Sequence, residues 1–472
     1  MKLVLNSKWF YVIFWSLILI LFVSRAMPYW MHGPFGFGYD VGIYKHVFEG
    51  IRTLPDVLGS EVYPFPSFLA YLVNLLGLPV DWLLYHAHIL FSVLVVVPLY
   101  FLTKDLFGKV AGLLAIVIFT ISYTQVFGSE FYLYKAELGA IFMLASLLFY
   151  MRRSYWFFLF VVLLGLTQLP QYIVMVAGIG TAAFFGLWKD YKYNFLVLLS
   201  FVLAFDFVAI LSPHHIWNAW DVVQGSLLGE AVLSSHHSGL FISLREFLGK
   251  ESVVFLLAAS GFVLTLKKKG VLALQASLAF VTLVVVARLF FENRFVLEMH
   301  FLLIPFAAYF IYKVFKAVVE EKGLSEKVWA LGGVALVFIS GYIVYGYYLT
   351  TRAALSEYEQ WALQVINEKE DSKNIMVSSS IYAPWAYGFS GKTTLAPGIF
   401  SSVWSYEDQV EYFTGEAEDR ALMLLDIAKK RGKFYLFEGQ SQDRSFIEAE
   451  SECITKIFDV GDATVYEVIP CP

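Results

Sequence analysis

Asp40 stands out as a candidate for chemistry. It follows a Gly- and Pro-rich turn, 33–38, that cannot continue a preceding helix, and it precedes a segment, 41–52, whose apolar residues recur at spacings of three and four. The pattern predicts a short amphipathic helix lying in the membrane interface, with a carboxylate at its start. Such a carboxylate can accept a proton or bind a metal ion. The alternative is structural, because Asp is a favoured N-cap residue.

A second acidic stretch, 128–137, lies between two apolar runs. It contains Glu130, Lys135 and Glu137. Glu130 is the better candidate for catalysis because Glu137 falls inside the apolar run that follows. Either carboxylate can instead form an ion pair with Lys135. Lys135 is in turn a candidate to bind an anionic substrate.

Two arginines, Arg288 and Arg294, follow a later apolar run. An arginine at the end of a membrane helix can hold a phosphate with two parallel hydrogen bonds. We therefore predict that both bind substrate. The alternatives are an interfacial anchor or an ion pair with Glu292 or Glu298.

Histidines gather near the same predicted face of the membrane, among them His86 and His88. Histidine pairs near carboxylates suggest a metal site, but their spacing matches no closed structural motif. Oxygen ligands from Asp40 and Glu130 suit Mg²⁺ or Mn²⁺ better. We therefore take His86 and His88 as candidates for substrate binding, with hydrogen bonds to headgroups or water as the alternative.

The elements that position these residues are membrane helices. Of the 472 residues, 59% are hydrophobic and only 15% are charged, and the mean hydropathy is +0.66. These values exclude an ordinary soluble domain and indicate a polytopic, mainly α-helical membrane protein. The apolar runs of membrane-crossing length number about eleven. They are 9–27, 83–103, 110–127, 137–151, 155–169, 171–188, 195–212, 251–266, 271–287, 296–313 and 328–349.

Basic residues fall at alternate ends of these runs, so every basic group lies on one side. By the positive-inside rule that side is the cytoplasm. The first run reads as a retained signal anchor, which places the N-terminus in the cytoplasm and the C-terminus outside the plasma membrane. The loop 28–82 then lies outside. The pair 155–169 and 171–188 is either a tight helical hairpin or a re-entrant kink.

The chain divides into a membrane domain, 1–349, and an external tail, 350–472. The tail is acidic and shows the patterns of a small α/β domain. We predict strands at 374–378 and 433–437, a helix at 417–430, and a hairpin of 454–459 with 464–469. Both cysteines, Cys453 and Cys471, lie in it, either as a disulfide or as two free thiols.

The order of these features resembles the GT-C superfamily of integral-membrane glycosyltransferases, which includes protein O-mannosyltransferases, aminoarabinose transferases and the catalytic subunit of oligosaccharyltransferase. The resemblance is carried by 38–44 in the first loop, the short acidic loop, Arg294 with the run 302–308, and the tail segment 382–394. It implies transfer of a sugar from a polyprenyl-phosphate-linked donor to a lipid, glycan or protein acceptor on the outer face of the membrane.

The resemblance also implies residue roles. Asp40 would be the general base or a metal ligand, Glu130 the second-loop acid and Arg294 the phosphate-binding arginine. Tyr39, beside Asp40, would bind substrate. The sequence lacks the Asp-Glu pair of the O-mannosyltransferases and the second-loop DxD of oligosaccharyltransferases, so the acceptor stays open.

A lipid transporter or flippase is the main alternative function. It requires ionisable residues along a path through the membrane, and Asp206 is the one good candidate. A non-catalytic scaffold that presents the tail is a third reading, but it leaves the short acidic loop unexplained. Charge blocks that would indicate a nucleic-acid partner are absent.

Overall fold

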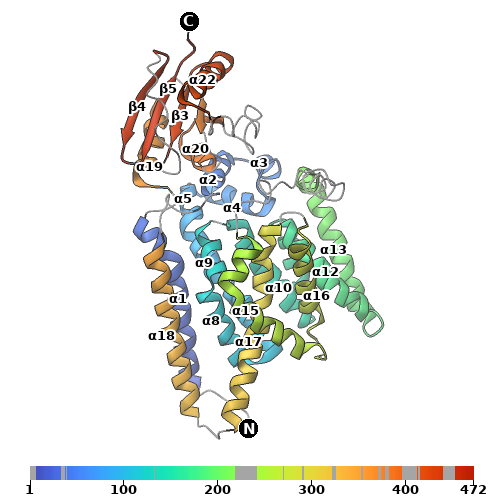
Figure 1. Ribbon diagram of the computed structural model, residues 1–472. Helices are drawn as coiled ribbons and strands as arrows, with labels where there is room; N and C mark the ends of the chain where they lie inside the picture. Colours follow the sequence, from blue (N-terminus) through green and yellow to red (C-terminus); the bar gives the residue numbers. More distant parts are fainter. Residues whose placement is uncertain are drawn as a thin grey trace. The chain divides into compact units, whose positions relative to one another are not determined.

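The computed structural model describes residues 7–32, 38, 40–131, 133–217, 242–268, 270–289, 292–321, 326–351, 355–369, 374–377, 382–395, 412, 415–439 and 452–471 (Figure 1). The chain forms two compact units. The first comprises Met1–Met27, Ile51–Gly77 and Tyr85–Thr351. The second comprises Pro28–Gly50, Leu78–Leu84 and Arg352–Pro472. The second unit therefore joins part of the first loop to the tail.

The first unit is built from helices. They are α1 (Ser7–His32), α3 (Leu54–Leu58), α4 (Pro64–Leu75), a π-helical turn (Leu83–Ala87), α6 (His88–Leu94), α7 (Val96–Phe107), α8 (Lys109–Ile121), α9 (Tyr123–Glu130), α10 (Tyr134–Met151), α11 (Trp156–Gly165), α12 (Leu169–Gly186), α13 (Tyr191–Leu211), α15 (Leu244–Thr265), α16 (Leu272–Val286), α17 (Glu292–Glu321) and α18 (Glu326–Thr350). The last residues of α1, from Pro28 on, and the first two residues of the π-helical turn, Leu83 and Leu84, belong to the second unit.

Each of the eleven predicted spans is helical, which confirms the polytopic α-helical fold. Within the described residues, eight helical segments are long and apolar enough to cross a membrane alone. A ninth is α8 with α9, which are bent by 54° relative to each other. The other two, α11 and α16, have 10 and 15 residues, fewer than the roughly 20 that a straight crossing needs.

Basic residues from separate loops meet at one end of the first unit, as the sequence predicts. Arg152 pairs with Asp105 at 2.6 Å and Arg153 with Asp190 at 2.8 Å. The Lys268 ammonium donates to the Leu106 carbonyl at 2.6 Å, which caps the end of α7. These contacts support the alternation on which the predicted topology rests.

The predicted pair at 155–188 is a helical hairpin. Phe157 of α11 packs against Tyr150 at the end of α10, with ring centroids 6.0 Å apart and the rings tilted by 56°. Gln171 at the start of α12 donates to the Ala136 carbonyl near the beginning of α10 at 2.8 Å. Helix α11 therefore runs antiparallel to α10, and α12 runs parallel to it.

The second unit is an α/β structure. Its helices are α2 (Val41–Gly50), α5 (Val80–Trp82), α19 (Glu357–Asn367), α20 (Ala383–Phe389) and α22 (Ala417–Arg431). Its strands are β1 (Asn374–Val377), β2 (Thr393–Leu395), β3 (Phe434–Glu438), β4 (Ile454–Val460) and β5 (Ala463–Val468). They form one sheet in the order β2-β1-β3-β5-β4. Strand β1 is parallel to β2 and β3, whereas β5 is antiparallel to β3 and β4.

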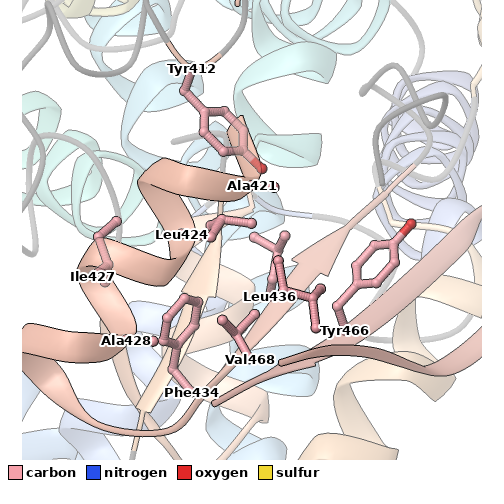
Figure 2. Packing of buried hydrophobic residues seen from close by; sticks show 10 residues of the cluster. Tyr412, Ala421, Leu424, Ile427, Ala428, Phe434, Leu436, Tyr466 and Val468 are labelled. Carbon is pink, nitrogen blue, oxygen red and sulfur yellow. The ribbon is translucent and has the colours of Figure 1, made fainter. Parts of the chain in front are cut away.

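The predicted tail elements are confirmed, because β1, β3, α22 and the β4–β5 hairpin lie where the sequence pattern places them. Figure 2 shows the core: Leu424 and Ala428 of α22 pack against Phe434 and Leu436 of β3 and Val468 of β5. Strand β2 was not predicted, because its three residues are too few to show an alternating pattern.

Cys453 and Cys471 form a disulfide, which resolves the two alternatives for these thiols. The bond ties the end of the chain to the residue before β4. Such bonds persist in oxidising compartments, so the disulfide agrees with the predicted external tail.

The prediction for 41–52 needs a correction. A helix is present as α2, but its apolar residues Val41, Tyr44 and Phe48 are buried, so protein and not lipid covers this face of the helix. The helix packs against α20 so closely that a Cβ atom at Gly42 would collide with the Pro384 carbonyl. Amphipathic periodicity gives the buried face of a helix but not what covers it.

Candidate functional site

Asp40 lies in the turn before α2, half-buried in the second unit. Its carbonyl accepts from the Tyr44 N–H at 3.2 Å, and the Val41 N–H donates to the Gly38 carbonyl at 3.3 Å. Gly38 has a φ of 91°, which favours glycine there. The backbone of Asp40 thus begins the helix, and both the N-cap and the catalytic roles of its carboxylate stay predictions. Tyr39, the predicted neighbouring contact, lies outside the described residues.

Packing of α2 fixes this turn. Gly388 of α20 approaches the backbone of Gly42 so closely that a side chain on either residue would collide. Lys45 of α2 pairs with Asp81 of α5 at 3.0 Å. Asp40 is therefore presented by a short helix that is clamped on two sides within its unit.

Glu130 is the last residue of α9 in the first unit, and it is half-buried. Its Oε1 accepts from the Thr351 hydroxyl at 3.0 Å. Buried carboxylates keep such partners because an unsatisfied charge is expensive. Glu130 and Asp40 belong to different units, so each is considered separately.

Glu137, which the sequence analysis set aside, lies in a buried polar cluster. Its carboxylate accepts from the Ser92 hydroxyl, and its Oε2 lies 3.5 Å from His88 Nδ1. The Ser92 and Ser129 hydroxyls are 3.1 Å apart, and His88 Nε2 lies 3.2 Å from the Ser129 carbonyl. The available signal was an ionisable residue one turn inside a membrane helix, which usually has a partner there.

His88 and His86 differ sharply in their surroundings. His88 is fully buried in this cluster, whereas His86 lies exposed on the π-helical turn. A π-helical turn inserts an extra residue into a helix and often occurs at functional sites. Substrate binding by His86 and by His88 stays a prediction, and of the two only His86 is exposed.

Lys135 lies in a cluster of aromatic and imidazole rings. Its ammonium is 5.6 Å from the centroid of the Tyr63 ring, and the Tyr63 and His215 rings are 4.3 Å apart. Burial raises the pKa of Tyr63 to about 12, and the nearby charge of Arg294 opposes this rise. Burial, with smaller contributions from His214 and Lys135, lowers the pKa of His215 to about 4. His215 is therefore neutral near pH 7, and the positive charge here belongs to Lys135 and Arg294.

The two predicted arginines occupy different positions. Arg294 lies half-buried in the first turn of α17, close enough to Tyr63 to affect its ionisation. Arg288 is exposed at the end of α16. Glu298, an alternative partner, accepts from the Gln171 side chain at 3.2 Å. The structure thus groups Lys135 and Arg294 around Tyr63.

Within the described residues, no group of three or more His, Cys, Asp or Glu side chains is placed to hold a metal ion. Asp206, the residue on which the transporter alternative rested, lies exposed on α13.

Comparison with known proteins gives matches at the level of structure. No family model and no curated protein sequence matches the chain. The apo oligosaccharyltransferase of Archaeoglobus fulgidus aligns with a TM-score of 0.64 at 14% identity, over 92% of this chain and 70% of that one. ArnT from Cupriavidus metallidurans, bound to undecaprenyl phosphate, aligns with a TM-score of 0.58 at 14% identity, over 99% and 100%. The chain has the fold of the GT-C membrane glycosyltransferases.

A third GT-C structure, the arabinofuranosyltransferase AftD from Mycobacteria, aligns with a TM-score of 0.54 at 13% identity over 99% of this chain and 40% of that one. These matches confirm the resemblance that the sequence motifs indicated. What the structures share with this chain is the GT-C fold, and the roles of Asp40, Glu130 and the cationic residues stay predictions.

Proposed function

We propose that the protein is a membrane glycosyltransferase that moves a sugar from a polyprenyl-phosphate-linked donor to a lipid, glycan or protein acceptor on the outer face of the plasma membrane. The observation that carries the proposal is the match to ArnT, which spans both chains almost end to end and was solved with undecaprenyl phosphate bound. The oligosaccharyltransferase structures include one with dolichol phosphate and an inhibitory peptide and one tethered to an acceptor peptide.

The cationic residues of the first unit support a phosphate-linked donor. Lys135 lies over the Tyr63 ring and lowers the pKa of His215, and the charge of Arg294 lowers the pKa of Tyr63. Arg294 also lies in the first turn of α17, where the helix dipole favours an anion. Arginine can hold a phosphate through two parallel hydrogen bonds. We therefore assign Lys135 and Arg294 to the donor phosphate, where they stabilise the charge that develops as the sugar departs.

Asp40 is proposed to remove the proton from the acceptor, and Glu130 to act as the second acid. A carboxylate suits this task because sugar transfer passes through an oxocarbenium-like state that a nucleophilic oxygen must attack. Asp40 is held in a fixed turn, and Glu130 at the end of a fixed helix. Pre-positioning of this kind lowers the barrier by reducing the entropy that the reaction must lose.

A divalent cation, Mg²⁺ or Mn²⁺, is proposed to take part in transfer, with the Asp40 or the Glu130 carboxylate, each within its own unit, as a ligand. One carboxylate is enough for such a role, because magnesium is often held by one or two carboxylates together with substrate phosphates. An oligosaccharyltransferase structure of the same fold contains Zn and sulfate. When bound, the ion would offset charge on the phosphate. Loss of transfer in EDTA, with recovery on adding Mn²⁺, is expected; unchanged turnover would leave that role to the arginine.

The test uses purified full-length protein with radiolabelled polyprenyl-phosphate sugars and measures released lipid phosphate. Asp40→Asn is expected to reduce release by about 10²-fold or more, since it removes the general base. The matched control is Asp56→Asn, in the same loop. Asp56 accepts from the Thr53 N–H at 2.7 Å in the capping box of α3, and an Asn oxygen can replace it.

Normal release by Asp40→Asn would remove Asp40 from the mechanism. Movement of the labelled lipid between leaflets without any release of lipid phosphate, in the wild type, would contradict transfer and favour a flippase.

A further inference from the structure

The helix that carries Glu130 begins at a sharp break in the membrane part of the first unit. Ser122 has an extended backbone, with φ −67° and ψ 126°, between α8 and α9. The two helices are bent by 54° there. Helix α9 has only 8 residues, too few to be stable alone. Its direction must therefore be set by contacts at its ends.

Glu251 of α15 holds the start of α9. Its Oε1 accepts from the Ser122 hydroxyl at 2.7 Å and from the Thr124 N–H at 3.0 Å. The Thr124 N–H is one of the first amides of α9, which have no partner inside the helix. The Glu251 side chain is buried, so these bonds are made away from water. One carboxylate oxygen thus fixes both the break and the first turn after it.

His300 of α17 completes the network. Its Nδ1 accepts from the side-chain amide of Gln125 at 2.9 Å, so the proton of the neutral imidazole is on Nε2. Nε2 lies 3.2 Å from the Ser122 hydroxyl oxygen and donates to it. Ser122 in turn donates to Glu251. Donors and acceptors therefore alternate correctly around the network, from Gln125 through His300 and Ser122 to Glu251.

The backbone of α15 is itself altered at this contact. Glu251 has non-helical angles, φ −118° and ψ 17°, inside an otherwise continuous helix of 22 residues. Two membrane helices, α8–α9 and α15, therefore both depart from regular geometry where they meet. A buried carboxylate in a membrane span is costly and usually functional.

The far end of α9 is held as well. Ser129 makes the contacts with Ser92 and His88 described above, and Glu130 follows it directly. With both ends bound to neighbouring helices, the position of the Glu130 carboxylate depends on the direction that Glu251 gives to α9.

We propose that Glu251 is a positioning residue: through Ser122 and the first amides of α9 it sets the direction of that helix and so places the Glu130 carboxylate for transfer. The inference rests on the proposed function. The start of α9, where Glu251 binds, lies about two helical turns from Glu130, so Glu251 acts on the reaction only through that helix.

The first test compares Glu251→Ala with Glu251→Gln in the transfer assay. Alanine removes the acceptor oxygen, and kcat is expected to fall by about tenfold to a hundredfold while KM for the donor changes less than about twofold, because α9 is misdirected. Glutamine retains an acceptor oxygen and is expected to restore at least half of kcat. The matched control is Glu246→Ala, on the same helix and also bonded to α9, through Tyr123, but exposed. It is expected to leave kcat unchanged.

The second readout does not depend on activity. Hydrogen exchange of the amides of residues 123–130 is expected to speed up by about tenfold or more in Glu251→Ala and to match the wild type in Glu251→Gln. Should Glu251→Ala fail to fold, Ser122→Ala removes a smaller part of the network and is expected to change exchange and kcat in the same direction.

Faster exchange with normal kcat, or unchanged exchange, would overturn the positioning role. A different outcome separates the two proposals. If the wild type releases no lipid phosphate but Glu251→Ala still exchanges faster, Glu251 does hold α9 and the proposed function is wrong.

Discussion

At Arg288, a single substitution can test the effect on stability and the effect on substrate binding separately. Its φ of 52° lies in the left-handed region, and its N–H donates to the Val285 carbonyl at 3.3 Å, ending α16. Glycine is preferred at this position, and another residue costs roughly 1 kcal/mol there. Arg288→Gly is therefore expected to keep or raise the thermal midpoint while KM for the donor rises about tenfold, because a hydrogen bond to a charged group contributes about 1.5–3 kcal/mol.

Arg153→Gly is the matched control for this prediction. Arg153 has the same φ of 52° at the end of α10, but it belongs to the opposite, basic end of the first unit and pairs with Asp190. Its substitution is expected to leave the donor KM unchanged. An unchanged KM in Arg288→Gly as well, measured by initial rates, would show that this guanidinium does not contact the donor.

At the scale of elements, the contact between α2 and α20 holds the turn that carries Asp40. A Cβ atom at Gly42 would collide with the Pro384 carbonyl, so Gly42→Ala must separate the helices. Overpacking of this kind costs about 1–3 kcal/mol. We expect faster proteolysis of the second unit and at least about a tenfold loss of transfer. Gly50→Ala is the control, because nothing lies within 4 Å of a Cβ added there; equal effects of the two variants would contradict the packing argument.

The same contact shows what sequence can and cannot predict. The periodicity of 41–52 predicts a helix correctly, since local spacing is all that it requires. It cannot predict burial against α20, whose residues lie about 340 positions further along the chain. Glu137 was ranked below Glu130, and Glu251 was missed, for a related reason: each lies in an apolar run, and only the packed helices bring Ser92 and Ser122 to them.

For the whole molecule, the predicted topology follows from the basic end of the first unit, where Arg152, Arg153 and Lys268 gather. Positive residues stay on the cytoplasmic side, so this end is expected to face the cytoplasm. In intact cells, Lys189→Cys should resist a membrane-impermeant maleimide and Glu61→Cys should react, both positions being exposed. The native cysteines add no background because they are joined. The reverse labelling pattern would place Cys453 and Cys471 in a reducing compartment and contradict transfer on the outer face.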